Sequence, residues 1–249
     1  MNLKNSNNDA HEHSRLEKVA NWYSPKQGFM GRLACYGFQS LRPYFVGSKC
    51  LELGPGDGPM TRMLLDAFQS VTCVDGSPSF CQKLRDSFGD FKGFKVECSL
   101  FEKYCAPSPF NTILAAHVLE HVEDPVHVLQ RIKGWLSQEG VLLVLVPNTF
   151  SFHRLAAVKM GLLSAPEQLN ELDHRLGHRR VYNLKLLLEH LNSAGWEVQT
   201  TGGVFFKVFT NQQIENWFTE PMMDGFYELG KDFPAYAAEI YAVCRLRKD

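Results

Sequence analysis

LELGPGDG, which occupies Leu51–Gly58, is the stretch that decides the fold of this chain. An apolar run, Lys49–Leu53, predicts a short buried strand before the first glycine, and residues 59–68 predict a helix after the last one. The glycines, at alternate positions from Gly54 to Gly58, therefore occupy a turn between a strand and a helix. Glycine suits such a turn because it adopts positive φ and because its missing Cβ lets a ligand lie against the backbone. We expect a ligand here, where the helix start also offers unpaired backbone N–H groups.

A single carboxylate, Asp75, closes the next apolar run and indicates the kind of ligand. It lies 75 − 52 = 23 residues after Glu52, where a nucleotide-binding α/β unit places an acid on the ribose hydroxyls. The loop reads G-x-G-x-G, which matches neither the G-x-G-x-x-G of dinucleotide-binding loops nor a phosphate loop ending in Gly-Lys-Ser/Thr. An acid on each side of the turn and the absence of a lysine also disfavour pyrophosphate. The pattern predicts a cationic ligand that carries a ribose.

These features resemble motif I and the ribose-binding acid of the class I S-adenosylmethionine (SAM) methyltransferases. The stretches Val74–Ser77, His117–Pro125 and Val141–Asn148 resemble further motifs of the same family. The resemblance implies SAM as the cofactor and S-adenosylhomocysteine (SAH) as its product. It also implies a set of cofactor-binding residues, namely Glu52, Gly54, Pro55, Gly56, Gly58, Asp75, Gly76, Ser77, Ser99, Leu100 and His117.

Strands and helices alternate along the rest of the chain, which predicts an α/β fold with a doubly wound sheet. The run Val141–Val146 is apolar at every position, as in a parallel strand that is covered on both faces. We predict strands at 49–53, 71–75, 94–97, 112–116, 141–146, 196–202 and 239–246, and helices at 59–68, 78–88, 125–137 and 183–194. The resemblance implies a Rossmann-like seven-stranded sheet, mostly parallel, in which the last strand is antiparallel.

Residues outside this pattern predict a helical cap. We expect residues 1–15, which are polar and rich in Asn, to be a disordered tail, and residues 16–47, with a helical pattern, to form an N-terminal helical cap. The SAM-binding domain then spans residues 48–249. Two insertions, at about 149–180 and 204–238, are long for connections in a compact domain and predict lids or binding elements. Their aromatic residues also fit a satellite core or a subunit interface, so a homodimer is possible.

HVLEH, at His117–His121, follows a predicted strand. As a bare H-x-x-E-H pattern it matches the inverzincin peptidases, but their chemistry needs both histidines on one helix, and here Pro125 starts a new helix. The stretch is more similar to the motif after the fourth strand of SAM methyltransferases. In the ubiquinone-biosynthesis O-methyltransferases and the small-RNA 2′-O-methyltransferases this motif reads E-x-x-E-H and binds a divalent metal. This chain has His117 in place of the first Glu. We therefore expect no metal. If a metal does bind here, its ligands are Glu120 and His121.

The predicted activity is methyl transfer to a small-molecule acceptor, at the oxygen of a hydroxyl or a carboxylate. A hydroxyl acceptor needs a general base, and histidine titrates in the useful range. We expect His117 and then His178 in this role, and expect His153, His174, His178 and Trp217 to contact the acceptor. A carboxylate acceptor needs no base. N-methylation of a small molecule, methylation of RNA and a SAM-fold module without chemistry remain as alternatives.

Composition and charge argue against two classes of binding partner and indicate a compartment. The net charge of −1, without a dense basic stripe, predicts no nucleic-acid partner. No run approaches the ~18 apolar residues of a membrane span, which predicts no membrane partner. Seven cysteines without paired spacing indicate a reducing compartment, and we expect a cytoplasmic protein.

Overall fold

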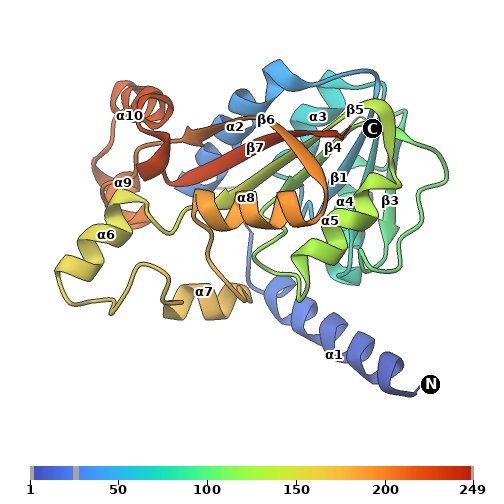
Figure 1. The fold of residues 1–249 in the computed structure, drawn as a ribbon, viewed down its shortest axis with the longest axis horizontal. Coiled ribbons are helices and arrows are strands. Elements are labelled where there is room, and N and C mark those ends of the chain that lie inside the picture. Colours follow the sequence, from blue (N-terminus) through green and yellow to red (C-terminus); the bar gives the residue numbers. More distant parts are fainter. Residues whose placement is uncertain (1–2, 25–27, 248–249) are drawn as a thin grey trace.

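A seven-stranded sheet crosses the middle of the molecule in the order β3-β2-β1-β4-β5-β7-β6 (Figure 1). The computed structural model describes residues 3–24 and 28–247. The strands are β1 Lys49–Leu53, β2 Ser70–Asp75, β3 Phe94–Cys98, β4 Phe110–Ala116, β5 Leu136–Pro147, β6 Trp196–Val204 and β7 Glu239–Leu246. The predicted seven-stranded sheet is confirmed.

The sheet is parallel except at β7. β1 pairs in parallel with β2 and with β4, and the outer pairs β2–β3 and β4–β5 are also parallel. β7 lies antiparallel between β5 and β6, as predicted for the last strand. The chain winds outward in opposite directions from β1 and β4, and in such sheets ligands bind beyond the carboxyl ends of the strands at this switch point. The glycine loop leaves β1 there.

Helices cover both faces of the sheet, and each face has its own hydrophobic core. α5 and α8 contribute to one core, and α2, α3, α4 and α10 contribute to the other. Along β5, Leu142 and Val144 face the first core, whereas Val141 and Leu143 face the second, which explains the unbroken apolar run. The helices are α1 Leu3–Ala20, α2 Gly28–Leu41, α3 Thr61–Ala67, α4 Pro78–Phe88, α5 Pro125–Lys133, α6 Phe152–Lys159, α7 Glu171–Leu176, α8 Leu184–Ser193, α9 Asn211–Trp217 and α10 Glu220–Asp232, with short 3-10 helices at Arg42–Tyr44 and Pro234–Tyr236.

The helix predicted at 125–137 is too long. It starts as expected, because the Asp124 side chain accepts a hydrogen bond from the backbone of the first turn and Pro125 occupies the first helical position. It ends at Lys133, and β5 already begins at Leu136, which pairs with Phe110 of β4. The apolar residues here fit a helical stripe and a strand equally well, so pairing with a distant strand decides between them.

The N-terminal segment also differs from its prediction. Residues 1–15 are expected to be a disordered tail, but α1 begins at Leu3; residues 1–2 lie outside the described part of the chain. The helix is anchored to the α/β body: His13 Nδ1 lies 2.7 Å from the carbonyl oxygen of Gly76, and Glu17 accepts hydrogen bonds from Ser77 and Ser79 at the start of α4. These contacts over a long sequence separation explain why a polar segment is helical here.

The two predicted insertions contain the remaining helices. The first, after β5, holds α6 and α7, and the second, after β6, holds α9 and α10, which lie near α6 at one end of the molecule in Figure 1. The two insertions touch through a backbone hydrogen bond of 3.0 Å from His153 N to Lys207 O. Across residues 3–24 and 28–247, no helix combines the length and the apolar character that a membrane span requires.

Candidate active site

The glycine loop has the backbone conformation that its sequence predicts. Gly54, Gly56 and Gly58 have φ values of 60°, 58° and 85°, a region that disfavours other residues. At Gly58, steric crowding is a second reason for glycine, because a Cβ there would come within 2.7 Å of Phe88. Gly54 and Gly56 face a cavity, whereas Gly58 packs against α4 and does not.

Two buried acids flank this loop. Asp75 accepts backbone hydrogen bonds from Ser77 (2.8 Å) and Gly56 (3.3 Å), and Glu52 accepts one from the Thr61 hydroxyl (2.7 Å). Burial raises the pKa of Asp75 to about 6, although these N–H groups oppose the shift, and burial raises the pKa of Glu52 to about 7. Both carboxyls therefore titrate near neutral pH before a ligand is bound.

A cavity of about 330 Å³ runs from the glycine loop to the two insertions. Its wall brings together most of the residues that the sequence predicts: Glu52, Gly54, Pro55, Gly56, Asp75, Gly76, Ser99, Leu100, His117, His153 and His178. Because these residues come from the ends of four parallel strands and from the first insertion, the carboxyl edge of the sheet forms the floor of the cavity.

Three other residues that the sequence predicts for the site do not line this cavity. Ser77 caps α4 by accepting a hydrogen bond from Phe80 N, and it is absent from the cavity wall. His174 lies within α7, where its carbonyl accepts from the backbone of Gly177. Trp217 is 58% exposed at the end of α9 and packs edge-on against Phe209. The structure therefore places none of the three where it would touch a ligand in the cavity.

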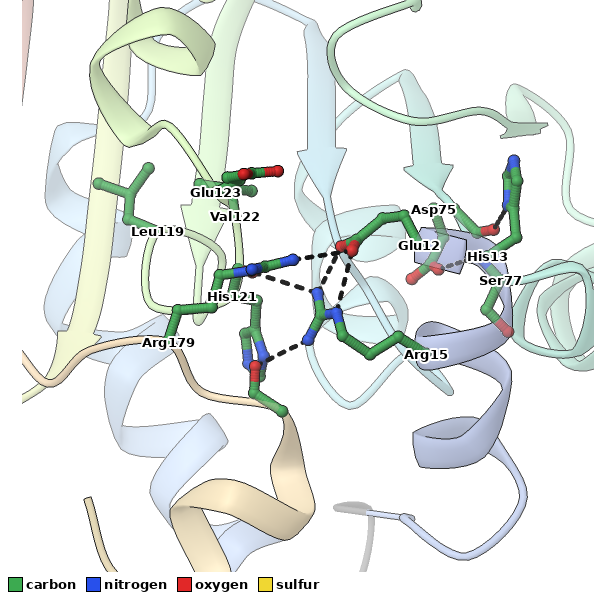
Figure 2. Close-up of polar contacts among 12 residues, drawn as sticks. Glu12, His13, Arg15, Asp75, Ser77, Leu119, His121, Val122, Glu123 and Arg179 are labelled. Carbon is green, nitrogen blue, oxygen red and sulfur yellow. Dashed lines mark hydrogen bonds and ion pairs between the residues drawn. The ribbon is translucent and has the colours of Figure 1, made fainter. Parts of the chain in front are cut away.

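The cap predicted at residues 16–47 contributes to the wall of this cavity, but the sequence analysis missed that the wall extends back along α1 to Glu12. The residues of α1 that line the cavity are Glu12, Arg15, Leu16 and Val19. Figure 2 shows Arg15 between Glu12 and the loop after β4: its guanidinium donates to Glu12 and to the carbonyl oxygens of His121 (3.1 Å) and Gly177 (2.7 Å). The signal was present, since positions 12, 15, 16 and 19 follow the i, i+3, i+4, i+7 spacing of one helical face.

His117 is held between two carboxylates. Its Nδ1 lies 3.3 Å from Glu120 Oε1 and its Nε2 lies 2.9 Å from Glu239 Oε1. It also has a φ of 55°, which is rare for a residue other than glycine. Burial by itself would lower the pKa of His117, but the two carboxylates outweigh it and raise the pKa to about 10. An imidazolium cannot accept a proton, so the structure argues against the predicted role of His117 as general base.

His178 has the opposite arrangement. Its Nδ1 lies 3.2 Å from Asp173 Oδ1, and Arg154 donates to the other oxygen of Asp173 at 3.0 Å. Burial would raise the pKa of Asp173, but these contacts and a backbone N–H lower it to about 2. An ionised carboxylate only accepts hydrogen bonds, so Nδ1 of His178 carries the hydrogen. Nε2 of the same ring is not engaged by Asp173.

The same histidine belongs to a group that could hold a metal ion. One ligand atom each from Glu120, His121 and His178 lies within 4.8 Å of the others. Burial lowers the pKa of His121 to about 4, aided by the positive charge of Arg15 and opposed by Glu120, so its ring is neutral and can act as a ligand. The imidazolium of His117 already offsets part of the charge of Glu120, although Glu239 shares the same cation. These residues fit a borderline ion such as Zn²⁺ better than Mg²⁺, which prefers oxygen ligands.

Comparison with known proteins identifies the family. Residues 27–201 match a family model described as a methyltransferase domain, so the chain belongs to this methyltransferase family. Its class is that of the SAM-dependent methyltransferases with a Rossmann-like fold, as the sequence motifs predict, and the cofactor of this class is SAM.

Individual relatives are distant and differ in their chemistry. The chain is 27% identical over 150 residues to a ubiquinone biosynthesis O-methyltransferase of Actinobacillus pleuropneumoniae, a match that covers 55% of this chain and 64% of that protein. It is 26% identical over 113 residues to an (S)-coclaurine N-methyltransferase of Thalictrum flavum, covering 43% of this chain and 31% of that one. The chain thus spans less than two thirds of these curated relatives, and they do not agree on the acceptor atom.

Solved structures show the same fold. The N-methyltransferase NodS of Bradyrhizobium japonicum, in complex with SAH, superposes with a TM-score of 0.61 at 13% identity, over 95% of this chain and 99% of that one. The [4+2]-cyclase SpnF superposes with a TM-score of 0.60 at 17% identity, over 92% and 86%. Since one of these carries the name of a cyclase, the fold by itself does not define the reaction.

Proposed function

We propose that this chain transfers the methyl group of SAM to an oxygen atom of a small molecule bound between the loop after β4 and the two insertions. One observation carries the proposal: a single cavity joins Gly54, Gly56 and Asp75 at the cofactor loop to His178 and His153 of the first insertion. Cofactor and acceptor would therefore share one cavity. A cavity of about 330 Å³ suits a small acceptor rather than a folded nucleic acid.

Methyl transfer from a sulfonium depends mainly on alignment. The acceptor oxygen forms a bond to the methyl carbon while the bond between carbon and sulfur breaks, and SAH leaves with the electron pair. The enzyme holds the three atoms in line and excludes water, which can supply much of the rate enhancement. α1 contributes by closing the cavity over Gly76 and Leu100 through Leu16, since a Cβ on Gly76 would come within 2.5 Å of Leu16 and 2.9 Å of Leu100.

For a hydroxyl acceptor, we assign the general base to His178. Asp173 fixes its tautomer and leaves Nε2 free to take the hydroxyl proton, the arrangement that a general base requires. His178 also lines the cavity, next to the ring of His121 at 4.7 Å. The imidazolium of His117 has a different task in this proposal: it holds two buried carboxylates in place and offsets part of their charge.

The test is a screen of small-molecule extracts with SAM that reads SAH release, followed by identification of the methylated product. We expect an O-methylated small molecule, and we expect His178→Gln to lose turnover with this acceptor while its SAH affinity stays near wild type. Methyl incorporation into RNA, or an N-methylated product, would replace the proposal with one of those activities. SAH release that never exceeds the no-acceptor control would favour a module without chemistry.

A further inference from the structure

The acceptor end of the cavity contains a lysine without a charged partner. Among the described lysine and arginine side chains on the cavity wall, Arg15 pairs with Glu12 and Arg154 pairs with Asp173, but Lys207 forms no ion pair. Its Nζ donates to Asn211 Oδ1 at 2.5 Å and lies 5.3 Å from the ring centroid of Phe29. A cation in such surroundings is costly unless an anion joins it.

The desolvation of Lys207 shows in its acid–base behaviour. Burial lowers the pKa of Lys207 to about 8, and Glu239 opposes this shift only from beyond ion-pair distance. One Glu239 oxygen, Oε1, already pairs with His117, and the other, Oε2, is buried without a hydrogen-bond partner. No described carboxylate forms an ion pair with Lys207, which leaves room for a counter-ion from a ligand.

Two unpartnered polar side chains line the same cavity as this lysine. Ser151 is fully buried, its hydroxyl has no hydrogen-bond partner, and it leaves the start of α6 uncapped although serine usually caps such a position. His153 Nδ1 is likewise buried without a partner, and the backbone N–H of His153 bonds to the carbonyl of Lys207. Both residues line the cavity. Buried polar groups are rarely left unsatisfied, so these two point to a ligand that bonds them.

We propose that the small-molecule acceptor carries a carboxylate or a comparable small anionic group, which pairs with Lys207 and accepts hydrogen bonds from Ser151 and His153. The inference rests on the proposed methyl transfer and adds the chemical class of the acceptor. The anionic group anchors one end of the molecule where the two insertions meet, and the opposite end reaches the cofactor methyl beside the loop after β4. An anion held at Lys207 is a specificity contact rather than the methylated atom.

The test compares two ligands of the same shape and different charge. Calorimetry measures 4-hydroxybenzoate and 4-hydroxybenzamide binding to the SAH complex of the wild-type chain, of Lys207→Met, of Lys207→Arg and of the control Lys159→Met, whose lysine is exposed at the end of α6. The wild type and the control should prefer the anion by about ten- to a hundred-fold. Lys207→Met should lose this preference, and Lys207→Arg should keep a measurable part of it.

The outcomes separate this inference from the methyltransferase proposal. Equal binding of the two probes by the wild type, or an unchanged preference in Lys207→Met, overturns the anion site while leaving methyl transfer intact. A fall in SAH affinity in Lys207→Met with the probe preference unchanged would assign the lysine to the carboxylate of the cofactor and also overturn the proposal.

If Lys207→Met does not fold, loss of the preference in Ser151→Ala with Lys207→Arg still folded supports the site, and persistence of the preference contradicts it. Failure of wild-type SAH binding would instead contradict the cofactor assignment.

Discussion

Asp75 should make cofactor binding depend on pH, and the structure sets the sign and size of the effect. The carboxylate is expected to accept hydrogen bonds from the ribose hydroxyls, so a proton and the ribose compete for the same oxygens. Because burial raises the pKa of free Asp75 to about 6, affinity should be full well above pH 6 and should fall as the pH drops through that value. One pKa unit corresponds to about 1.4 kcal/mol, so affinity should fall roughly tenfold per pH unit below the pKa.

Calorimetric titration with SAH between pH 5 and 8 measures this dependence directly. Asp75→Asn keeps the size of the side chain but cannot ionise, and it should bind SAH about ten- to a hundred-fold more weakly at neutral pH, because hydrogen bonds to a charged acceptor contribute ~1.5–3 kcal/mol. Its affinity should no longer fall below pH 6. Proton release on binding, measured in buffers of different ionisation enthalpy, should also disappear in this variant.

A second buried acid provides the control. Burial raises the pKa of Glu52 to about 7, and its carboxyl is bonded to Thr61 rather than directed only at the cavity. Glu52→Gln should therefore keep the loss of affinity below pH 6. A flat wild-type profile, or the same slope in Asp75→Asn, would refute the assignment of Asp75 to the ribose; loss of the slope in Glu52→Gln would transfer that role to Glu52.

Four further expectations follow from the site. His178→Gln should lower turnover by ~10²–10⁴-fold in steady-state kinetics, and unchanged turnover would exclude it as the base. Excess EDTA should leave activity intact, because the imidazolium of His117 already interacts with Glu120; loss that one divalent ion restores, with metal found by elemental analysis, would contradict this. Trp217→Ala should leave kcat and KM near wild type, since its ring lies outside the cavity, whereas a marked loss would return it to the acceptor site. Arg15→Ala should raise amide hydrogen exchange in α1 and weaken SAH binding, while Arg62→Ala, 56% exposed, should do neither.

The parts of the site that the sequence predicts are those with local causes. The positive φ of Gly54 and Gly56 follows from a strand and a helix only a few residues apart, and Asp75 follows from its place at the end of the next strand. Parallel strands bring such ends to one edge of the sheet, so a motif and its spacing are enough to place these residues together. The same reasoning placed His117 beside the cofactor loop, where the structure has it.

The number of aromatic residues in the second insertion does not predict where their rings lie. The second insertion is predicted to be a lid or binding element, with a satellite core as the alternative for its aromatic residues, and several of its rings form such a core: Phe205 is fully buried and packs against Phe29 at 5.1 Å, with Tyr36 stacked on Tyr227 at 4.3 Å. These rings anchor the insertion to α2. The functional residue of the segment is instead Lys207 in our proposal, a single lysine whose significance depends on what surrounds it. A sequence shows that a lysine is present, but only a fold shows that it lacks a counter-ion.

Glu239 shows most clearly why the chemistry of His117 lay beyond the sequence. The prediction looked for site residues at the carboxyl ends of strands, which is correct for parallel strands. β7 runs the other way, so its first residue reaches the edge where the other strands end: Glu239 pairs with Pro147, the last residue of β5. That pairing brings a carboxylate to within 2.9 Å of His117 Nε2 from 122 positions away in the chain, and it converts an apparent base into a cation. In a sheet with one antiparallel strand, the start of that strand therefore belongs among the candidate site positions.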